Sequence, residues 1–143
     1  MTQPASPLAF LDNDKAWDLL AGERLGRLAV LSTNGGIDIY PINYVVDGET
    51  LVFRTAEGTK LSSVQANAEV TFEIDAWNEE DGISVVAKGH ANAVTDEEEI
   101  AQIETLGLKP WVPTFKTFFV RIYIKEIQAR RFFFGQDPIE KYR

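Results

Sequence analysis

Hydrophobic and polar residues alternate with a period of two over most of the chain, as in strands with one buried and one exposed face. The first such run begins at Leu25 and ends at Asn34-Gly35-Gly36, residues that tolerate the positive φ of a tight hairpin. A second run covers Ile37 to Val46, Asp47-Gly48 gives the next hairpin signal, and a third run covers Leu51 to Thr55. The pattern predicts three consecutive antiparallel strands, a β-meander.

Three further strands are predicted in the second half of the chain. Val70, Phe72 and Ile74 alternate with polar residues and mark the fourth strand. The fifth is a long run from Ile83 to Val94, and the sixth covers Phe118 to Ile127, with a continuation toward Phe134.

Three short segments instead have helical spacing. Asp12 is a predicted N-cap for a helix that ends near Gly22, and a second helix is predicted from Thr59 to Asn67. Asp96 is the predicted N-cap of a third helix. Its first turn holds Glu97, Glu98 and Glu99, which we expect to be solvated charges that complement the helix dipole.

Six strands and three short helices, without internal repeats, predict a mainly β fold. We expect an antiparallel six-stranded barrel with a few short peripheral helices, because closure removes exposed sheet edges. Residues 11–143 should form a single domain, and residues 1–10 a flexible N-terminal segment.

Composition and charge exclude several function classes. The 143 residues contain no cysteine, which rules out disulfides and thiol chemistry. The net charge of −8 argues against nucleic-acid binding, which needs clustered Lys and Arg. The start does not have the pattern of a secretory signal, and no apolar run approaches the ~20 residues of a membrane helix. We therefore expect a cytoplasmic protein without nucleic-acid or membrane partners.

The usual catalytic and metal-binding constellations are missing. His90 is the only histidine, and it falls within a predicted strand, where a structural role is expected. Two acidic runs lie in a predicted loop and at a predicted helix start, and we expect both to be surface charge. They are Glu79-Glu80-Asp81 and Glu97-Glu98-Glu99. Redox chemistry carried out by a bound cofactor is still compatible with these residues, because the protein then needs only to bind and orient the cofactor.

The most informative segment is Phe53-Arg54-Thr55-Ala56-Glu57-Gly58-Thr59-Lys60-Leu61. A strand ends there, Gly58 permits a tight turn, and a helix begins at Thr59. Two cations, two hydroxyls and free helix N-terminal amides would then converge, and such groups bind an anion. In the alternative interpretation, Thr59 only caps the helix and both cations point into solvent.

This segment resembles the corresponding one in the pyridoxamine 5′-phosphate oxidase-like flavoproteins, which have the FMN-binding split-barrel fold. The resemblance extends in order from Leu11 to Phe133. Its other matching pieces are Leu25-Gly26-Arg27-Leu28-Ala29, Pro41-Ile42-Asn43-Tyr44-Val45-Val46, Glu73-Ile74-Asp75, Ser84-Val85-Val86 with Gly89, and Arg131-Phe132.

The resemblance implies an FMN cofactor, a homodimer that completes each site at its interface, and a small-molecule substrate. The FMN phosphate would be held by Arg54, Thr55, Thr59 and Lys60. The isoalloxazine ring would lie along Pro41, Ile42, Asn43 and Tyr44, mainly against backbone groups. The second subunit would contribute Trp77, Ser84, Trp111 and Arg131.

Two departures bear on the reaction. Pyridoxamine phosphate oxidases bind their substrate through a C-terminal Arg and His, whereas residues 136–143 contain no histidine. Leu61 stands where those oxidases have a second cation. We therefore expect a flavin-dependent oxidoreductase with another substrate, and no catalytic side chain is nominated. The alternatives are a deazaflavin-dependent reductase, a non-catalytic flavin- or haem-binding protein, and an interaction module without a ligand.

Overall fold

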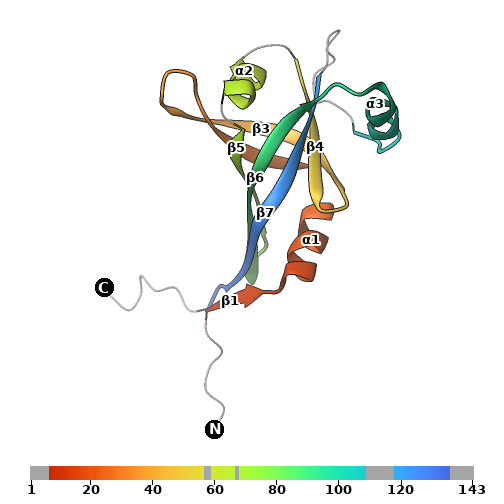
Figure 1. Ribbon diagram of the computed structural model, residues 1–143. Coiled ribbons are helices and arrows are strands. Elements are labelled where there is room, and N and C mark those ends of the chain that lie inside the picture. Colours follow the sequence, from red (N-terminus) through yellow and green to blue (C-terminus); the bar gives the residue numbers. More distant parts are fainter. Residues whose placement is uncertain (1–6, 57–58, 67, 109–117, 136–143) are drawn as a thin grey trace.

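The computed structural model describes residues 7–56, 59–66, 68–108 and 118–135, with only the backbone of residues 59–61 and 66 (Figure 1). The strands are β1 (Leu8–Leu11), β2 (Leu25–Leu31), β3 (Ile37–Asp47), β4 (Thr50–Thr55), β5 (Glu69–Trp77), β6 (Asp81–Val94) and β7 (Phe118–Phe133). The helices are α1 (Asn13–Ala21), α2 (Thr59–Ala66) and α3 (Glu97–Glu104). None of these helices is long and apolar enough to cross a membrane.

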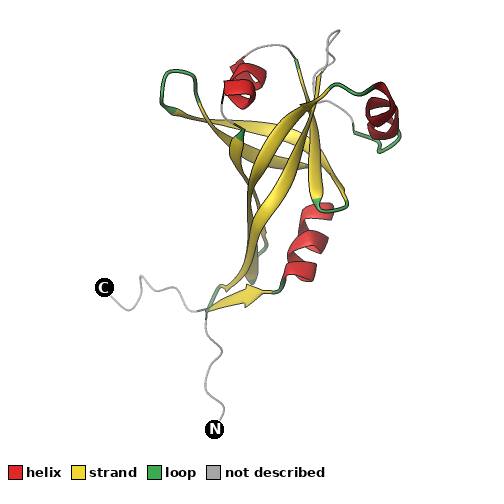
Figure 2. Cartoon of the chain, in the orientation of Figure 1, coloured by secondary structure: helices red, strands yellow, loops and turns green. Residues whose placement is uncertain are grey.

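The strands form one antiparallel sheet that closes on itself (Figure 2). The order is β1-β7-β4-β3-β2-β5-β6, and β6 pairs again with β7. The closed ring thus has the six predicted strands and includes the β2-β3-β4 meander. The sheet has a seventh strand, β1, because Leu8–Leu11 pairs with β7. Residues 8–10 therefore differ from the expected flexible segment, and residues 1–6 lie outside the described part.

Strand β7 joins the two halves of the barrel. Its first half lies between β4 and β6, and its second half lies between β1 and β6. A β-bulge between Lys88 and Gly89 shifts the β6–β7 register. Val120 and Ile122 before the bulge and Ala129 after it are all buried in the core, although an unbroken period of two would separate them.

The barrel interior forms the main hydrophobic core. Phe53 and Phe72 are fully buried there with the inward-facing residues of every ring strand. Helices α1 and α2 contribute Leu20 and Val64 to the same cluster. Asp12 caps α1 as predicted, since its carboxylate accepts a hydrogen bond from the Lys15 amide at 2.8 Å.

Helix α3 covers the outside of the barrel over β4 and β7. Ile103 of the helix packs there with Val52 and Phe119 in a second apolar cluster. Arg121, which is nearly buried, donates to Asp47 and Glu99, each at 2.8 Å. The expectation that Glu97–Glu99 are all solvated was wrong for Glu99, because β7 places a cation beneath it.

The remaining outer surface, from β3 through β2 and β5 to β6, carries a charged cluster. Arg27 of β2 lies opposite Glu73 of β5, and its guanidinium forms ion pairs with Glu73 and with Asp75, the latter at 2.9 Å. Burial raises the pKa of Glu73, and the neighbouring Asp75 carboxylate raises it further, while Arg27 opposes both effects.

Replacing Gly89 by Ala is predicted to destabilise the barrel. A Cβ at this position would overlap the Tyr123 carbonyl oxygen across the β6–β7 bulge. The strands must move apart to admit it, so we expect a loss of about 1–3 kcal/mol in the free energy of unfolding, measured by urea denaturation. Gly36→Ala is the matched control, because its Cβ would meet only ordinary contacts at 3.5 Å. Equal stability of the two variants would contradict the prediction.

The Glu73 carboxyl is predicted to titrate above the ordinary glutamate range, and Asp75→Asn should lower its pKa by removing a like charge. A raised pKa in the folded state means that the folded protein binds this proton more tightly than the unfolded chain. Stability is therefore lost as the pH rises from the ordinary glutamate pKa through the raised pKa of Glu73. Carboxyl-detected NMR titration measures the shift. Asp14→Asn, at an exposed site on α1, should leave the Glu73 pKa unchanged.

Candidate functional site

The predicted phosphate-binding segment begins at the end of β4. Arg54 is half-buried, pairs with Phe119 of β7, and places its guanidinium carbon 5.5 Å from the centre of that ring. It shares the outer face of β4 with Val52, two residues earlier. Thr55 is buried, and its hydroxyl donates to the Ala56 carbonyl oxygen at 3.0 Å. Alternation therefore places Arg54 and Thr55 on opposite faces of β4.

Helix α2 begins four residues after β4 ends, as predicted. Thr59 and Lys60 are its first two residues, so their backbone amides belong to the helix N-terminus. Their side chains lie outside the described part of the chain, and their role as phosphate ligands stays a prediction. One turn later, Ser63 is fully buried, and its hydroxyl has no hydrogen-bond partner among the described residues. No motif in the sequence marks this serine.

The predicted ring-binding residues on β3 divide between two faces. The side chains of Ile42 and Tyr44 point into the barrel core, with 4% and 2% of their surfaces exposed. Pro41 is exposed and Asn43 is half-buried, both on the outer face. Only Pro41 and Asn43 can therefore offer side chains to a ligand outside the barrel, while Ile42 and Tyr44 can offer backbone groups.

Tyr44 has a structural role as well. Its hydroxyl donates to the Leu20 carbonyl oxygen in the last turn of α1, and its ring packs edge-on against Phe72 at a centroid distance of 4.7 Å. Burial raises the pKa of this phenol, and the nearby Glu23 carboxylate adds to the effect. Tyr44 thus fixes α1 against β3 and stays neutral, which does not favour a role as an acid or base at neutral pH.

Asn43 and Arg54 lie on the outer face, just beyond the end of the β3–β4 pairing. Tyr44 and Phe53 form the last pair and point into the core, so the next residue on each strand, Asn43 on β3 and Arg54 on β4, faces outward. The structure therefore places one predicted phosphate ligand and one predicted ring contact on the outer faces of two neighbouring strands.

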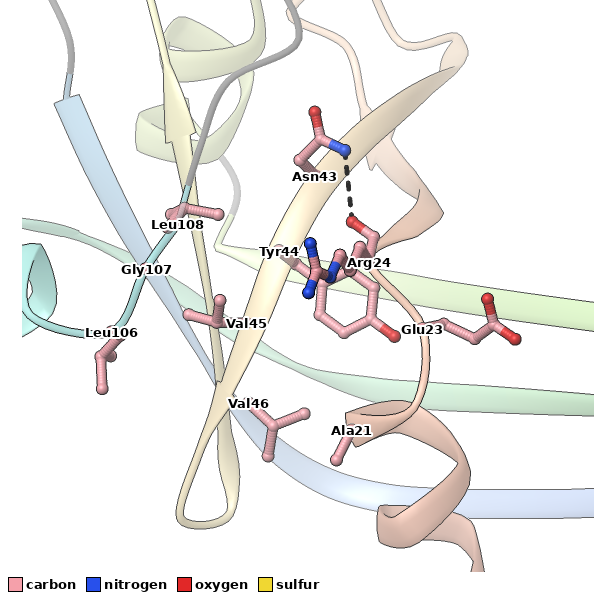
Figure 3. A pocket seen from close by; sticks show the side chains of 10 residues that line it. All are labelled: Ala21, Glu23, Arg24, Asn43, Tyr44, Val45, Val46, Leu106, Gly107 and Leu108. Atoms are coloured by element: carbon pink, nitrogen blue, oxygen red, sulfur yellow. Dashed lines mark hydrogen bonds between the residues drawn. The ribbon is translucent and has the colours of Figure 1, made fainter.

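A pocket of about 650 Å³ lies beside Asn43. Its walls come from the end of α1 and the turn after it, from β3, and from the segment after α3 (Figure 3). The lining residues are Ala21, Glu23, Arg24, Asn43, Tyr44, Val45, Val46, Leu106, Gly107 and Leu108. Its size suits a small organic ligand, and its walls combine apolar side chains with a few polar groups.

The residues expected from a second subunit lie away from this pocket. Trp77 is 77% exposed at the end of β5, and Asp75, two residues earlier on the same face, pairs with Ser84 of β6. Arg54 pairs with Phe119 near the start of β7, whereas Ser84 pairs with Arg130, eleven residues further along that strand. Trp111 lies outside the described residues.

Arg131 does not share a face with Ser84. It pairs with Ile83 and donates to Asp81 at 2.8 Å. The residue opposite Ser84 is Arg130, whose buried Nε has no hydrogen-bond partner among the described residues. The structure thus favours Arg130 over Arg131 as the cation on the outer face. The strand register determines which of the two arginines faces outward, and their adjacency in the sequence does not show which one does.

Arg24 was also missed by sequence reasoning. It lies in the two-residue connection between Gly22, the C-cap of α1, and β2. No motif surrounds it, and only the packing of α1 against β3 brings it to the pocket. The described residues contain no group of three His, Cys, Asp or Glu side chains that could hold a metal ion.

Comparison with known proteins identifies the family. The family model for pyridoxamine 5′-phosphate oxidase matches residues 12–131. The chain is 43% identical to a FAD-binding protein of Mycobacterium smegmatis, with a TM-score of 0.77, covering 89% of this chain and 100% of the other. It is 44% identical to a conserved protein of unknown function from Corynebacterium diphtheriae, with a TM-score of 0.77, covering 89% and 99%.

A curated relative supports the same assignment. An uncharacterized protein of Mycobacterium tuberculosis H37Rv is 42% identical over 94 residues, which are 66% of this chain and 86% of the relative. The match to the family model spans both the barrel and the candidate site on β3 and β4. The chain therefore belongs to the pyridoxamine 5′-phosphate oxidase family and has its antiparallel split-barrel fold.

Proposed function

We propose that the protein binds a flavin phosphate on the outer face of β3 and β4. The observation that carries the proposal is that Arg54 faces outward where β4 leads into the N-terminus of α2, while Asn43, which follows the end of the same β3–β4 pairing, lines a pocket of about 650 Å³. Helix N-terminal amides and a guanidinium are both suited to a phosphate group. Membership in the family and the FAD-binding relative from Mycobacterium smegmatis support the same ligand class.

Different residues of the chain would bind the phosphate and the ring of the flavin. Arg54, with the amides of Thr59 and Lys60, would hold the phosphate, and the outer edge of Pro41–Tyr44 would face the ring through backbone groups and Asn43. A bound flavin accepts or donates a hydride, so the protein needs only to orient it against a substrate. We propose an oxidoreductase on this basis, with no side chain nominated as an acid or base.

The sequence resemblance favours FMN, whereas the relative from Mycobacterium smegmatis is described as FAD-binding. FAD contains the FMN unit, so the same anchors serve both. A deazaflavin coenzyme is a third candidate for the same surface. Mass spectrometry of the small molecule released from the purified protein distinguishes the three. Turnover of NADH or NADPH by the flavin-loaded protein then separates an enzyme from a protein that only stores or senses its ligand.

Arg54→Ala and Lys60→Ala are each predicted to weaken FMN binding by about one to two decades. A hydrogen bond to a charged group contributes roughly 1.5–3 kcal/mol, which sets this range. Riboflavin shares the ring but lacks the phosphate, so its affinity should be low and nearly unchanged by either substitution. Titrations of both ligands followed by flavin fluorescence measure the phosphate contribution separately from the ring contribution.

The paired control for these titrations is Lys15→Gln, which removes one exposed positive charge on α1 without touching the site. It should leave both affinities unchanged. If riboflavin binds as well as FMN, or if neither anchor substitution changes FMN affinity, the strand-to-helix segment is an ordinary turn and the phosphate assignment is wrong.

The protein is predicted to be a homodimer in which Trp77 and Ser84 of one subunit complete the site of the other. The support is geometric: the β7 partners of Arg54 and Ser84, Phe119 and Arg130, are eleven residues apart, about 35 Å of extended strand, too far for both residues to join one site within one chain. Multi-angle light scattering should give twice the mass of the chain. Because Trp77 is 77% exposed, Trp77→Ala should lower FMN affinity without destabilising the barrel itself. A monomer that binds FMN tightly would refute this arrangement.

A further inference from the structure

The pocket beside Asn43 exists because two paired strands differ in extent. Strand β2 begins at Leu25, which pairs with Asn43, whereas β3 continues to Asp47. The last residues of β3 therefore lack β2 as a neighbour. Helix α1 packs near this edge, and the segment from Leu106 to Leu108 lies on the other side (Figure 3). The uncovered edge is the floor of the pocket.

Arg24 is held at this edge by its backbone. Its carbonyl oxygen accepts hydrogen bonds from the Tyr44 amide at 3.1 Å and from the Asn43 side-chain amide at 3.3 Å. These two hydrogen bonds fix the position of the Arg24 backbone from which the side chain extends. The exposed guanidinium then lines the pocket at little further cost in backbone entropy.

The guanidinium charge is not neutralised within the described part of the chain. No described carboxylate forms an ion pair with Arg24. Glu23 is adjacent in sequence and also lines the pocket, but its carboxylate points away from the Arg24 guanidinium (Figure 3). The other walls are largely apolar, with Val45, Leu106 and Leu108 among them.

We propose that this pocket is the substrate subsite, and that Arg24 binds an anionic group of a small substrate whose apolar or aromatic body lies against Val45, Leu106 and Leu108. A guanidinium forms paired hydrogen bonds with a carboxylate or a phosphate, and such pairs are strong where water is partly excluded. The inference rests on the proposed flavin site, because it assigns the neighbouring space to the molecule that reacts with the flavin.

Arg24 and the phosphate anchor Arg54 are separate cation sites. Arg24 precedes β2 and Arg54 lies on β4, so β3 runs between them. Their backbones are about two strand spacings, or about 10 Å, apart, and Arg54 is not among the residues that line the pocket. Asn43 lies between the two, on the outer face of β3. A ligand anchored at Arg54 and a second one anchored at Arg24 would therefore meet over Asn43.

Calorimetric titration of benzoate and phenyl phosphate tests the subsite, with benzamide as the neutral analogue. Each is added to the protein with and without saturating FMN, and binding to the native chain is compared with Arg24→Gln, Arg24→Lys and the control Lys15→Gln. We expect at least one anion to bind the FMN-loaded native protein, and its Kd to rise by about ten- to a hundredfold in Arg24→Gln. Arg24→Lys should retain part of the affinity, and Lys15→Gln all of it.

The two anions identify the preferred group as a carboxylate or a phosphate. FMN affinity should change by less than about twofold in Arg24→Gln. Anion binding that is unaffected by Arg24→Gln, or absent from the FMN-loaded native protein, overturns the subsite alone. Loss of FMN affinity in Arg24→Gln, or displacement of the anion by FMN, assigns the pocket to the cofactor and also overturns it. If no flavin binds while an anion still requires Arg24, the proposed function fails but the anion site stands.

Discussion

The antiparallel pairing of β6 with β7 is the contact on which the barrel depends. It is the longest pairing in the ring, running from Asp81 with Phe133 to Val94 with Phe119, and it joins the two ends of the strand order β7-β4-β3-β2-β5-β6. The bulge at Lys88 and Gly89 keeps this pairing compatible with a single core. Gly89 permits the close approach of Tyr123, and the extra residue on β7 turns Ile127 and Ala129 inward together with Val120 and Ile122.

Because the barrel is closed, each ring strand has an inner face toward the core and an outer face on the barrel surface. The inner faces hold the apolar core, and Tyr44 uses its one polar atom there to fix α1. The outer faces hold the ion-paired clusters of Arg27 and of Arg121. Over β4 and β7, α3 and Arg121 cover that surface, while over β2 and β5 the cluster of Arg27, Glu73 and Asp75 is open to solvent in the single chain. A ligand site on this fold has to use an outer face, because the interior is filled.

The proposed ligand sites follow from that division. Arg54 and Asn43 face outward just beyond the end of the β3–β4 pairing, and the early end of the β2–β3 pairing leaves a pocket next to Asn43. Arg24 reaches the pocket through backbone hydrogen bonds that have no sequence signature. The site is thus built from residues that the sheet aligns, together with one that a loop positions.

The sequence by itself determined the elements of this protein and the fold class. Period-two alternation predicted the six ring strands, and Asp12 and Asp96 marked two of the three helix starts, because these signals act over a few neighbouring residues. It also supplied the family through an ordered set of short matches. Tertiary structure alone decided the pairing of Leu8–Leu11 with β7, the ion pairs of Arg121 and the choice of Arg130 over Arg131 as the outward-facing cation. Those features depend on register and on contacts between distant segments, which local periodicity does not encode.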